Sequence, residues 1–237
     1  MIEITNTEVW GFEGALRGMR NPMNSWDKSD SHECLGECQH CEYLDTKHID
    51  FKECLYIGKN DLELAKKLVK AGSDHRKFMR MIHVQADVNA PLYWWKHLEQ
   101  YKVGTTTNST STMHKIHAKE FTIDDFSHEH LISLGHLNLT GQSEKCLQNT
   151  IEVMNGYRQM FIETKDKTYW YQMIQLLPSS YNQLRTIDLN YETLFSIYHA
   201  RKSHKLDEWH TFCEWIEKLP YMGDFLGLEE AENEEES

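Results

Sequence analysis

The amino-acid sequence predicts a helix-rich α/β protein with few strands. Apolar residues recur every three or four positions over long segments, most clearly from Ser143 to Lys165 and from Asp207 to Leu219, and this spacing is typical of amphipathic helices. Clear alternation of apolar and polar residues, which indicates a half-buried strand, occurs from Ile82 to Asn89. With 237 residues, 40% hydrophobic and 26% charged, the chain has a globular composition and is long enough to bury a full core.

The N-terminal part of the chain predicts one further strand and one helix. Met1–Trp10 alternates raggedly and predicts the strand. Asn60–Ala71 predicts the helix, with Asn60 as its N-cap and Glu63 at the capping-box position. Gly72 follows directly and is expected to end the helix.

The middle of the chain predicts a helix and then a loop. Pro91 suits the first turn of a helix that carries Trp94 and Trp95, whose rings are expected in the core. The segment Gly104–Thr112 consists almost entirely of Ser, Thr and Asn. We expect an irregular loop whose side chains hydrogen-bond its own backbone or a ligand.

Two more helices are expected in the C-terminal third. Thr168–Leu177 is stopped by Pro178, and Tyr191–Lys202 begins after Asn190, a good N-cap residue. Without repeats or linkers, residues 1–228 are expected to form one domain. It would carry an irregular Cys-rich insertion at about 31–54 and be followed by a disordered acidic tail, 229–237.

The charge of the chain excludes some classes of protein. The formal charge is −12, and six of the 37 acidic residues lie in the tail. Such an acidic body argues against binding long nucleic acids. A membrane span is not expected, because the chain has no run of about 18 apolar residues. The polar start is unlike a secretory signal, so we expect a reducing compartment, the cytoplasm (the host cytoplasm if a phage encodes the protein).

The cysteines form a cluster with the spacing C-x3-C-x2-C-x12-C. Four thiolates at such spacing can hold a structural zinc ion. Free thiols or an iron–sulfur cluster are the alternatives. Cys146 and Cys213 lie on expected helices and are interpreted as packing residues. The candidate metal ligands are Cys34, Cys38, Cys41 and Cys54.

Two stretches carry a recognisable pattern. From Ser73 to His114, a histidine precedes the alternating strand, Ala90-Pro91, a helix and the polar loop with its Asn108-x-x-Ser111 core. From Leu176 to Pro220, the spacing of Pro178, Asn190 and Arg201, with His204 following, completes the pattern. Together these stretches, about 85 residues, resemble the flavin-dependent thymidylate synthase family, most closely a divergent, phage-type branch.

The resemblance implies a fold and an activity. The fold would be an α/β (α+β) domain of the thymidylate-synthase-complementing type, with a small, mostly antiparallel central sheet. The activity would be transfer of a one-carbon unit from methylenetetrahydrofolate to C5 of dUMP, with hydride from a reduced flavin, FAD, that NADPH recharges. The family is homotetrameric with shared sites, so the resemblance also implies a homo-oligomer.

The resemblance implies roles for individual residues. Ser111 and Arg201 are the catalytic candidates. The nucleotide would contact Asn190, Arg201, His204 and Gln175, and the flavin would contact His75, Lys102 and Asn108.

The motif arginines of the family are replaced in this chain. Gln100, Tyr101 and Lys102 stand where the family has an Arg-His-Arg triplet, and Met113 stands for a further arginine. Gln172 and Gln175 lie where the family carries a Glu and an Arg. Amides and one lysine do not replace fork-shaped cations conservatively, so flavin binding is the implied property most affected.

Simpler interpretations stand beside these roles. Arg201 can be a surface arginine, Asn190 a helix cap, Ser111 a turn residue and His75 a structural histidine. The chain can therefore also be a non-catalytic nucleotide-binding or assembly protein. A third interpretation is an enzyme that modifies a different pyrimidine nucleotide.

Overall fold

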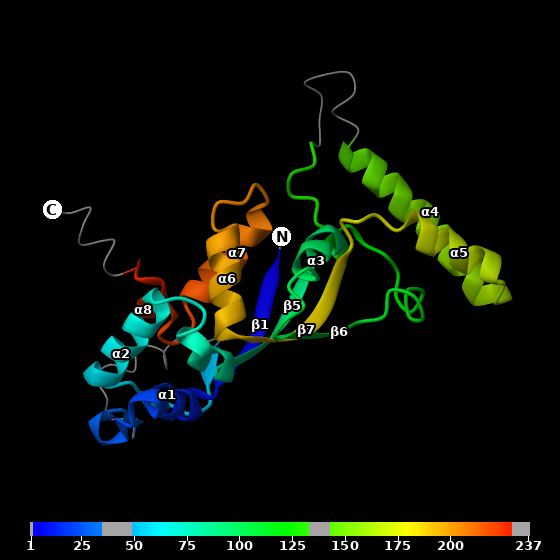
Figure 1. The fold of residues 1–237 in the computed structure, drawn as a ribbon. Coiled ribbons are helices and arrows are strands. Elements are labelled where there is room, and N and C mark those ends of the chain that lie inside the picture. Colours follow the sequence, from blue (N-terminus) through cyan, green and yellow to red (C-terminus); the bar gives the residue numbers. More distant parts are fainter. Residues whose placement is uncertain (1, 35–48, 133–142, 229–237) are drawn as a thin grey trace. The chain divides into compact units, whose positions relative to one another are not determined.

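The structure, a computed structural model, describes residues 2–34, 49–132 and 143–228 (Figure 1). The acidic tail and two of the candidate metal ligands, Cys38 and Cys41, lie outside the described residues. No helix in the described ranges has the length and apolar character needed to cross a membrane.

Helices and strands are interspersed along the chain. The first half contains β1 (Glu3–Trp10), α1 (Phe12–Arg20), η1 (Asn21–Met23), η2 (Trp26–Lys28), β2 (His32–Glu33), β3 (Ile49–Phe51), β4 (Leu55–Tyr56), α2 (Lys59–Lys70), η4 (Arg76–Met81), β5 (His83–Pro91) and α3 (Leu92–Leu98). The second half contains β6 (Thr105–Ser109), η5 (Ile123–Asp125), α4 (Ser143–Thr164), α5 (Lys167–Leu176), β7 (Asn182–Asn190), α6 (Tyr191–Arg201), α7 (Asp207–Glu217) and α8 (Met222–Leu226). The η elements are 3-10 helices.

A five-stranded sheet in the order β3-β1-β5-β7-β6 forms the centre of the fold (Figure 1). Strand β1 pairs with β3 in parallel. Strands β5 and β7 run in opposite directions, as two contacts between these segments show. The backbone N–H of Tyr191 donates to the oxygen of Ile82, and the hydroxyl of Thr186 donates to Asp87. The helix-rich α/β fold with a small central sheet is therefore confirmed, and the sheet contains both parallel and antiparallel neighbours.

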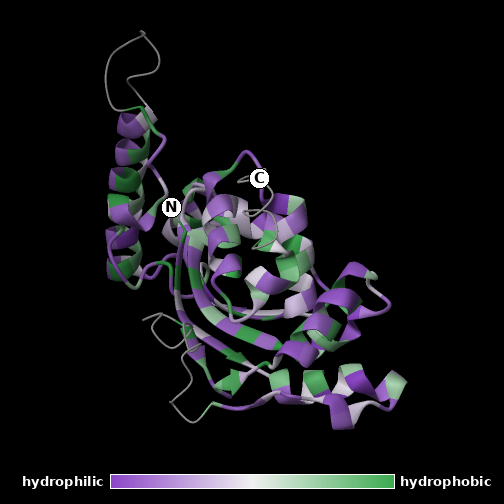
Figure 2. Cartoon of the chain, turned by 90° about the vertical axis from the view of Figure 1, so that its left-hand side faces the viewer, coloured by the Kyte–Doolittle hydropathy of each residue, from purple (hydrophilic) through white to green (hydrophobic). Residues whose placement is uncertain are grey.

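Alternation along β5 gives the sheet an apolar and a polar face. Val84, Ala86 and Val88 are buried, whereas His83 and Gln85 on the other face are half-buried. Figure 2 shows the corresponding mixture of hydrophobic and hydrophilic residues along the strands. This strand was expected from its alternation, and the structure confirms it.

The chain groups into two compact units. One comprises Met1–Glu3, Asn89–Gln100 and Ser109–Arg185. The other comprises Ile4–Val88, Tyr101–Asn108 and Thr186–Ser237. They are called the first and second unit below.

The first unit is built on the pair of helices α4 and α5. Its buried core includes Phe121, Phe126, Met154 and Met173. The indole Nε1 of Trp95 donates to the backbone oxygen of Gln183, and this bond ties α3 to β7. Large aromatic and thioether side chains thus hold the loops of this unit against its helices.

The second unit contains the helices around α6. Tyr191, which follows the last residue of β7, is buried, and its ring packs edge-on against Phe12 of α1 at 5.4 Å. Its hydroxyl donates to the backbone oxygen of Pro220, at 2.8 Å. The start of α6 is therefore fixed on two sides.

Several sequence-based expectations need correction. The helix α2 begins one residue early, and its cap is not Asn60 with Glu63 but the carboxylate of Asp30, which accepts from the N–H groups of Asn60 and Asp61. Thr105–Ser109 forms the strand β6 within the expected loop. Cys146 is exposed and does not pack, whereas Cys213 is buried as expected.

Candidate functional site

Asn190 connects the end of β7 to the start of α6. Its Oδ1 accepts from the backbone N–H of Thr193 at 2.9 Å, which confirms the expected N-cap. A side chain at Gly104, where φ is +69°, would clash with the amide nitrogen of Asn190. The hydroxyl of Thr193 donates to the backbone oxygen of Val103 at 3.1 Å. The segment that precedes β6 is thus bound to the first turn of α6.

The same segment reaches the other end of α6 through Tyr101. The Nε of Arg201 donates to the Tyr101 hydroxyl at 2.9 Å. The guanidinium lies 5.0 Å from the ring centroid of Trp209 and 5.6 Å from that of Tyr101. Neither Nη atom of Arg201 makes a hydrogen bond or ion pair within residues 2–34, 49–132 and 143–228. Two aromatic rings therefore hold a cation whose outer fork remains available.

His204 lies close to this cluster. Its ring centroid is 6.3 Å from that of Trp209, and its Nδ1 accepts from the backbone N–H of Leu206. The structure therefore brings two predicted nucleotide-binding residues, Arg201 and His204, to one aromatic side chain. Trp209, which lies in the first turn of α7, was not predicted as a site residue.

The predicted flavin-binding residues are all exposed. His75 precedes η4, Lys102 follows Tyr101, and Asn108 lies on the edge strand β6. Lys102 directly follows the tyrosine that binds Arg201, so these two residues lie on neighbouring positions of one segment. The structure shows no contact that brings Asn108 or His75 to Arg201.

A buried acid in the first turn of α6 is a feature that sequence reasoning missed. Glu192 is 8% exposed and pairs with two arginines of η4, Arg76 and Arg80. Arg76 also lies over the ring of Phe195, at 4.7 Å. A Glu in the first turn of a helix is common, so the sequence offered no signal that this one is buried.

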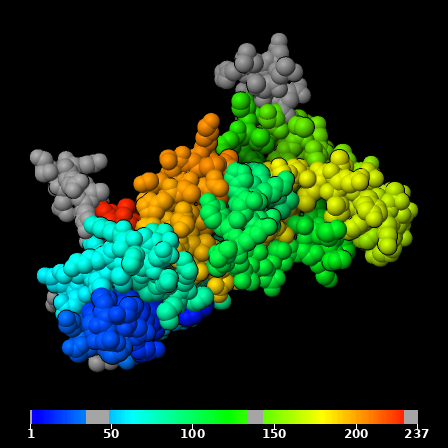
Figure 3. Space-filling model, viewed as in Figure 1, coloured from blue at the N-terminus to red at the C-terminus, as the bar shows by residue number. Residues whose placement is uncertain are grey.

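The electrostatics around α6 follow from this packing. Burial lowers the pKa of His199, and the nearby cations Lys202 and Arg76 lower it further, so its imidazole stays neutral. Burial also raises the pKa of Tyr198, whose hydroxyl donates to Glu217. Figure 3 shows the orange surface that α6 and α7 contribute to one face of the second unit.

The first unit contains a hollow of about 690 Å³ that includes Ser111. Other residues of its lining are Thr110, Lys115, Lys119, Asp125, Tyr181 and Asn182. Lys119 pairs with Asp125 at 2.6 Å. Burial raises the pKa of Tyr181, Asp125 raises it further and Lys119 opposes them, so the phenol stays protonated. The volume is within the range of small-molecule sites.

Ser111 is exposed, and its Oγ accepts from the backbone N–H of His114 at 2.9 Å, as in a turn. The residue before it is held by Gln183, whose amide donates to the oxygen of Thr110 at 2.6 Å. Gln183 in turn accepts from Arg185, which lies over Trp95 and pairs with Glu99. These contacts fix the rim of the hollow. Gln175, the other predicted residue of this unit, is exposed on α5.

Two of the candidate metal ligands face each other. The antiparallel register of β2 and β4 places Glu33 opposite Leu55, and Cys34 donates its N–H to the oxygen of Cys54 at 2.7 Å. In the described part of the chain, no group of three or more His, Cys, Asp or Glu side chains could hold a metal ion.

The structure thus belongs to the helix-rich α/β class. At the C-terminal end of its helix α6, aromatic rings hold the guanidinium of Arg201. No protein family matches the sequence, and no curated protein does. Solved structures share the fold. The flavin-dependent thymidylate synthase ThyX of Helicobacter pylori, complexed with FAD and dUMP, superposes with a TM-score of 0.62 and 15% identity, over 94% of this chain and 97% of that one.

A second kind of structural neighbour is the UMP/dUMP methylase PolB of Streptomyces cacaoi. Bound with 5-Br dUMP, it superposes with a TM-score of 0.57 and 14% identity, over 92% of this chain and 88% of that one. Bound with 5-Br UMP, it gives a TM-score of 0.58 and 12% identity, over 96% and 93%. The particular fold is thus the one shared by ThyX and PolB.

Proposed function

We propose that the protein methylates, or otherwise adds one carbon to, C5 of a pyrimidine nucleoside monophosphate, with dUMP as the first substrate to test. The observation that carries the proposal is Arg201, held by Tyr101 and Trp209 with its outer fork unpaired in the described residues. A guanidinium fork matches the oxygens of a phosphate. The nucleotide ligands in the crystals of both neighbours support this choice of substrate.

The residues of this chain would bind and orient the nucleotide. Arg201 would hold the phosphate through two parallel hydrogen bonds, with His204 beside it. Asn190 uses its Oδ1 for the cap and its Nδ2 lies against Gly104, so it would act on the nucleotide by fixing the start of α6. Ser111 and Gln175 belong to the first unit and stay predictions from the resemblance; Ser111 would act as a hydrogen-bonding group rather than as a nucleophile.

The predicted flavin-binding side chains are of chemical types that can bind a flavin. His75, Lys102 and Asn108 are exposed and offer an imidazole, an ammonium and an amide, which suit the phosphates and ring edge of FAD. A bound reduced flavin would supply hydride, with NADPH as the reductant and methylenetetrahydrofolate as the carbon donor. Purified protein that is yellow, with a flavin absorption band, supports this part of the proposal. Colourless protein that binds no added FAD contradicts it.

The activity is tested by incubating the protein with dUMP, methylenetetrahydrofolate, FAD and NADPH and measuring the nucleotide product by mass spectrometry. NADPH oxidation that requires both nucleotide and folate, with a product 14 mass units heavier (one CH₂), is the expected outcome. UMP in place of dUMP tests the alternative substrate that PolB suggests. A homo-oligomer, as a tetramer, is also proposed and is measured by light scattering.

The replaced motif arginines favour a second candidate, a non-catalytic nucleotide-binding or assembly protein. Gln100 and Tyr101 offer no cation, and Tyr101 is engaged with Arg201. A melting temperature that rises with dUMP, in a protein without turnover or bound flavin, would favour this candidate.

We also propose that Cys34 and Cys54 bind a structural zinc ion together with Cys38 and Cys41. The support is that β2 and β4 bring the backbones of Cys34 and Cys54 together, although the two residues are 20 positions apart in the sequence.

A further inference from the structure

A second hollow, of about 300 Å³, lies in the second unit between α1, η2 and β4. Its lining includes Arg17, Arg20, Trp26, Ser29 and Ser31, with Leu16 as an apolar wall. None of these residues belongs to the proposed nucleotide or flavin site. The volume suits one or two fused rings and is too small for a dinucleotide.

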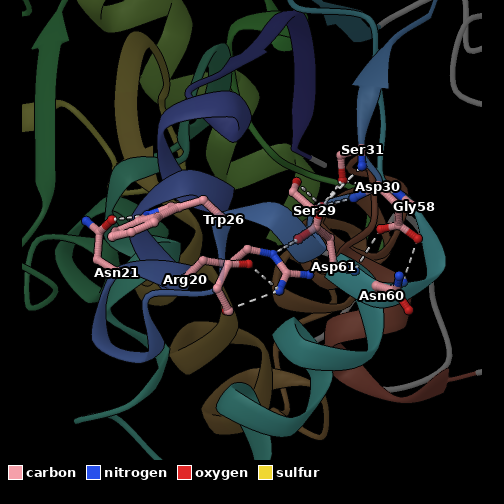
Figure 4. Close-up of polar contacts among 10 residues, drawn as sticks. Arg20, Asn21, Trp26, Ser29, Asp30, Ser31, Gly58, Asn60 and Asp61 are labelled. Carbon is pink, nitrogen blue, oxygen red and sulfur yellow. Dashed lines mark hydrogen bonds and ion pairs between the residues drawn. The ribbon is translucent and has the colours of Figure 1, made fainter.

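Trp26 presents a fixed aromatic ring at this hollow. The residue is 51% exposed, although an indole gains free energy from burial. Its Nε1 donates to the Oδ1 of Asn21 at 2.8 Å, which sets the direction of the ring (Figure 4). An exposed but oriented indole is a surface on which a flat ring can stack.

Arg20 also lines the hollow, and it belongs to a buried cluster of hydrogen-bonded polar groups. It is 4% exposed, and its Nε donates to Asp61 at 2.5 Å, while its Nη1 donates to the backbone oxygen of Ser25. Figure 4 shows Asp61 on one side of the guanidinium and Trp26 on the other. Its Nη2 is buried and has no hydrogen-bond partner among the described residues. An unsatisfied buried donor destabilises the fold, so an acceptor from a ligand would be stabilising.

Asp61 cannot supply that acceptor. It is fully buried, and its Oδ2 already accepts from the hydroxyls of Ser29 and Ser31, at 2.7 and 2.6 Å, and from the backbone N–H groups of Asp30 and Ser31. The cluster therefore holds Arg20 in one place while leaving one of its donors unused.

Arg17 adds an accessible cation at the rim. Its side chain is 68% exposed and pairs with Glu13 at 3.7 Å. Such a surface pair is weak because water screens both charges, so a ligand anion can displace the glutamate. Because Glu13 and Asp61 stay near the hollow, a single negative charge is favoured over a phosphate dianion.

We propose that this hollow binds a planar aromatic or heteroaromatic carboxylate. The ring stacks on Trp26, and the carboxylate accepts hydrogen bonds from Arg17 and from the Nη2 of Arg20. The site is independent of the proposed nucleotide chemistry, since it shares no residue with it.

The test uses nicotinate and nicotinamide, which have the same ring and nearly the same shape but differ in charge. The reporter is the indole N–H resonance of Trp26 in the ¹H–¹⁵N spectrum, assigned by its absence in Trp26→Phe. We expect nicotinate to shift this resonance in a saturable way. Nicotinamide should bind at least about tenfold more weakly, because it cannot make a charge-assisted hydrogen bond. Acetate, which has no ring, should not reproduce the shift.

Variants of exposed residues keep the test independent of folding. Arg17→Gln should weaken nicotinate binding by about tenfold, and Trp26→Ala should abolish saturation transfer to the ligand. Lys28→Gln and Met23→Ala remove an exposed charge and an exposed apolar side chain nearby and should change nothing. An unmoved Trp26 resonance, equal binding of the two probes, or binding indifferent to both variants would overturn the proposal. dUMP binding measured on the same samples reports separately on the proposed function.

Discussion

The hydroxyl of Tyr101 accepts a hydrogen bond from the Nε of Arg201 at 2.9 Å, which joins the segment before β6 to the end of α6. Tyr101 occupies one of the positions where the resembled family carries its cationic triplet. The tyrosine thus does not supply a charge but orients one that comes from another element.

Removing the Tyr101 hydroxyl should weaken the positioning of the Arg201 guanidinium while the arginine itself remains. We expect Tyr101→Phe to weaken dUMP binding several-fold, because the ring contact to the guanidinium remains and one hydrogen bond is lost. Isothermal titration calorimetry measures the change. Tyr171→Phe, at an exposed tyrosine of α5, is the control. Unchanged affinity in Tyr101→Phe would separate the tyrosine from nucleotide binding.

Arg201 itself should matter through its shape as well as its charge. Arg201→Lys keeps the charge but loses the fork, and we expect dUMP affinity to fall about tenfold, with a larger loss in Arg201→Gln. Lys218→Gln, which removes an exposed cation at the end of α7, should bind normally. If all three variants bound dUMP like the unmodified protein, the phosphate would lie elsewhere.

The acid between two arginines should contribute to stability. Glu192→Gln keeps the shape of the side chain but leaves Arg76 and Arg80 without their anion. We expect the free energy of unfolding to fall by about 2 kcal/mol, measured by urea denaturation. Glu214→Gln, at an exposed position of α7, should change it by less than about 0.5 kcal/mol. A similar loss in both variants would contradict this role.

The pKa of Asp61 should appear as a dependence of stability on pH. Burial acts to raise its pKa, but hydrogen bonds from Ser31, Ser29 and Arg20 outweigh burial and lower it. A lowered pKa in the folded state means that the ionised carboxylate stabilises the fold above its unfolded pKa, about 3.9. This stabilisation is lost as the pH falls through the folded pKa.

We therefore expect Asp61→Asn to be less stable than the unmodified protein at pH 7 by about 3 kcal/mol or more, since Arg20 loses its buried partner. The difference should shrink as the pH is lowered below about 4. Thermal unfolding at a series of pH values measures it. A difference that stays constant down to pH 2 would show that the charge of Asp61 is not responsible.

Protein purified without chelator should contain about one zinc ion per chain. Cys54→Ser should remove most of it, because a hydroxyl is a poor zinc ligand. Cys146→Ser, at an exposed cysteine on α4, should not. Metal analysis that finds no zinc in the unmodified protein, or the same zinc content in Cys54→Ser, would reject the site.

Much of the fold follows from local sequence signals. The long helix α4 was expected from its periodicity, and Asn190 was expected to cap α6, because a short amide side chain before an apolar run has one dominant use. The strand β5 followed from strict alternation. Where local propensity and tertiary packing agree, the pattern in the sequence is sufficient.

The strand β7 escaped prediction because its alternation is inverted at one end. Gln183 points inward, 5% exposed, while Leu184 is 42% exposed. The buried amide is satisfied by the oxygen of Thr110, a partner 73 residues away. In β6, exposed Thr, Asn and Ser form an edge strand that has no apolar face to reveal it. Long-range partners decide both strands.

The candidate site divides in the same way. Arg201 and His204 were expected from the resemblance to flavin-dependent thymidylate synthases, and they lie at one aromatic side chain. Trp209, Glu192 and the polar cluster around Arg20 and Asp61 were not expected. Each of them depends on which residues from distant segments become neighbours, and no local pattern encodes that.

The close approach of Gly104 to Asn190 makes one backbone position important for two structural roles, the N-cap of α6 and the placement of Tyr101. The amide that starts α6 and the segment that carries Tyr101 and Lys102 press together there without room for a methyl group. Enlarging that glycine would therefore displace the helix cap and the arginine's tyrosine partner in a single step. A methyl group at residue 104 would thus reach well beyond the residue itself, to both ends of α6.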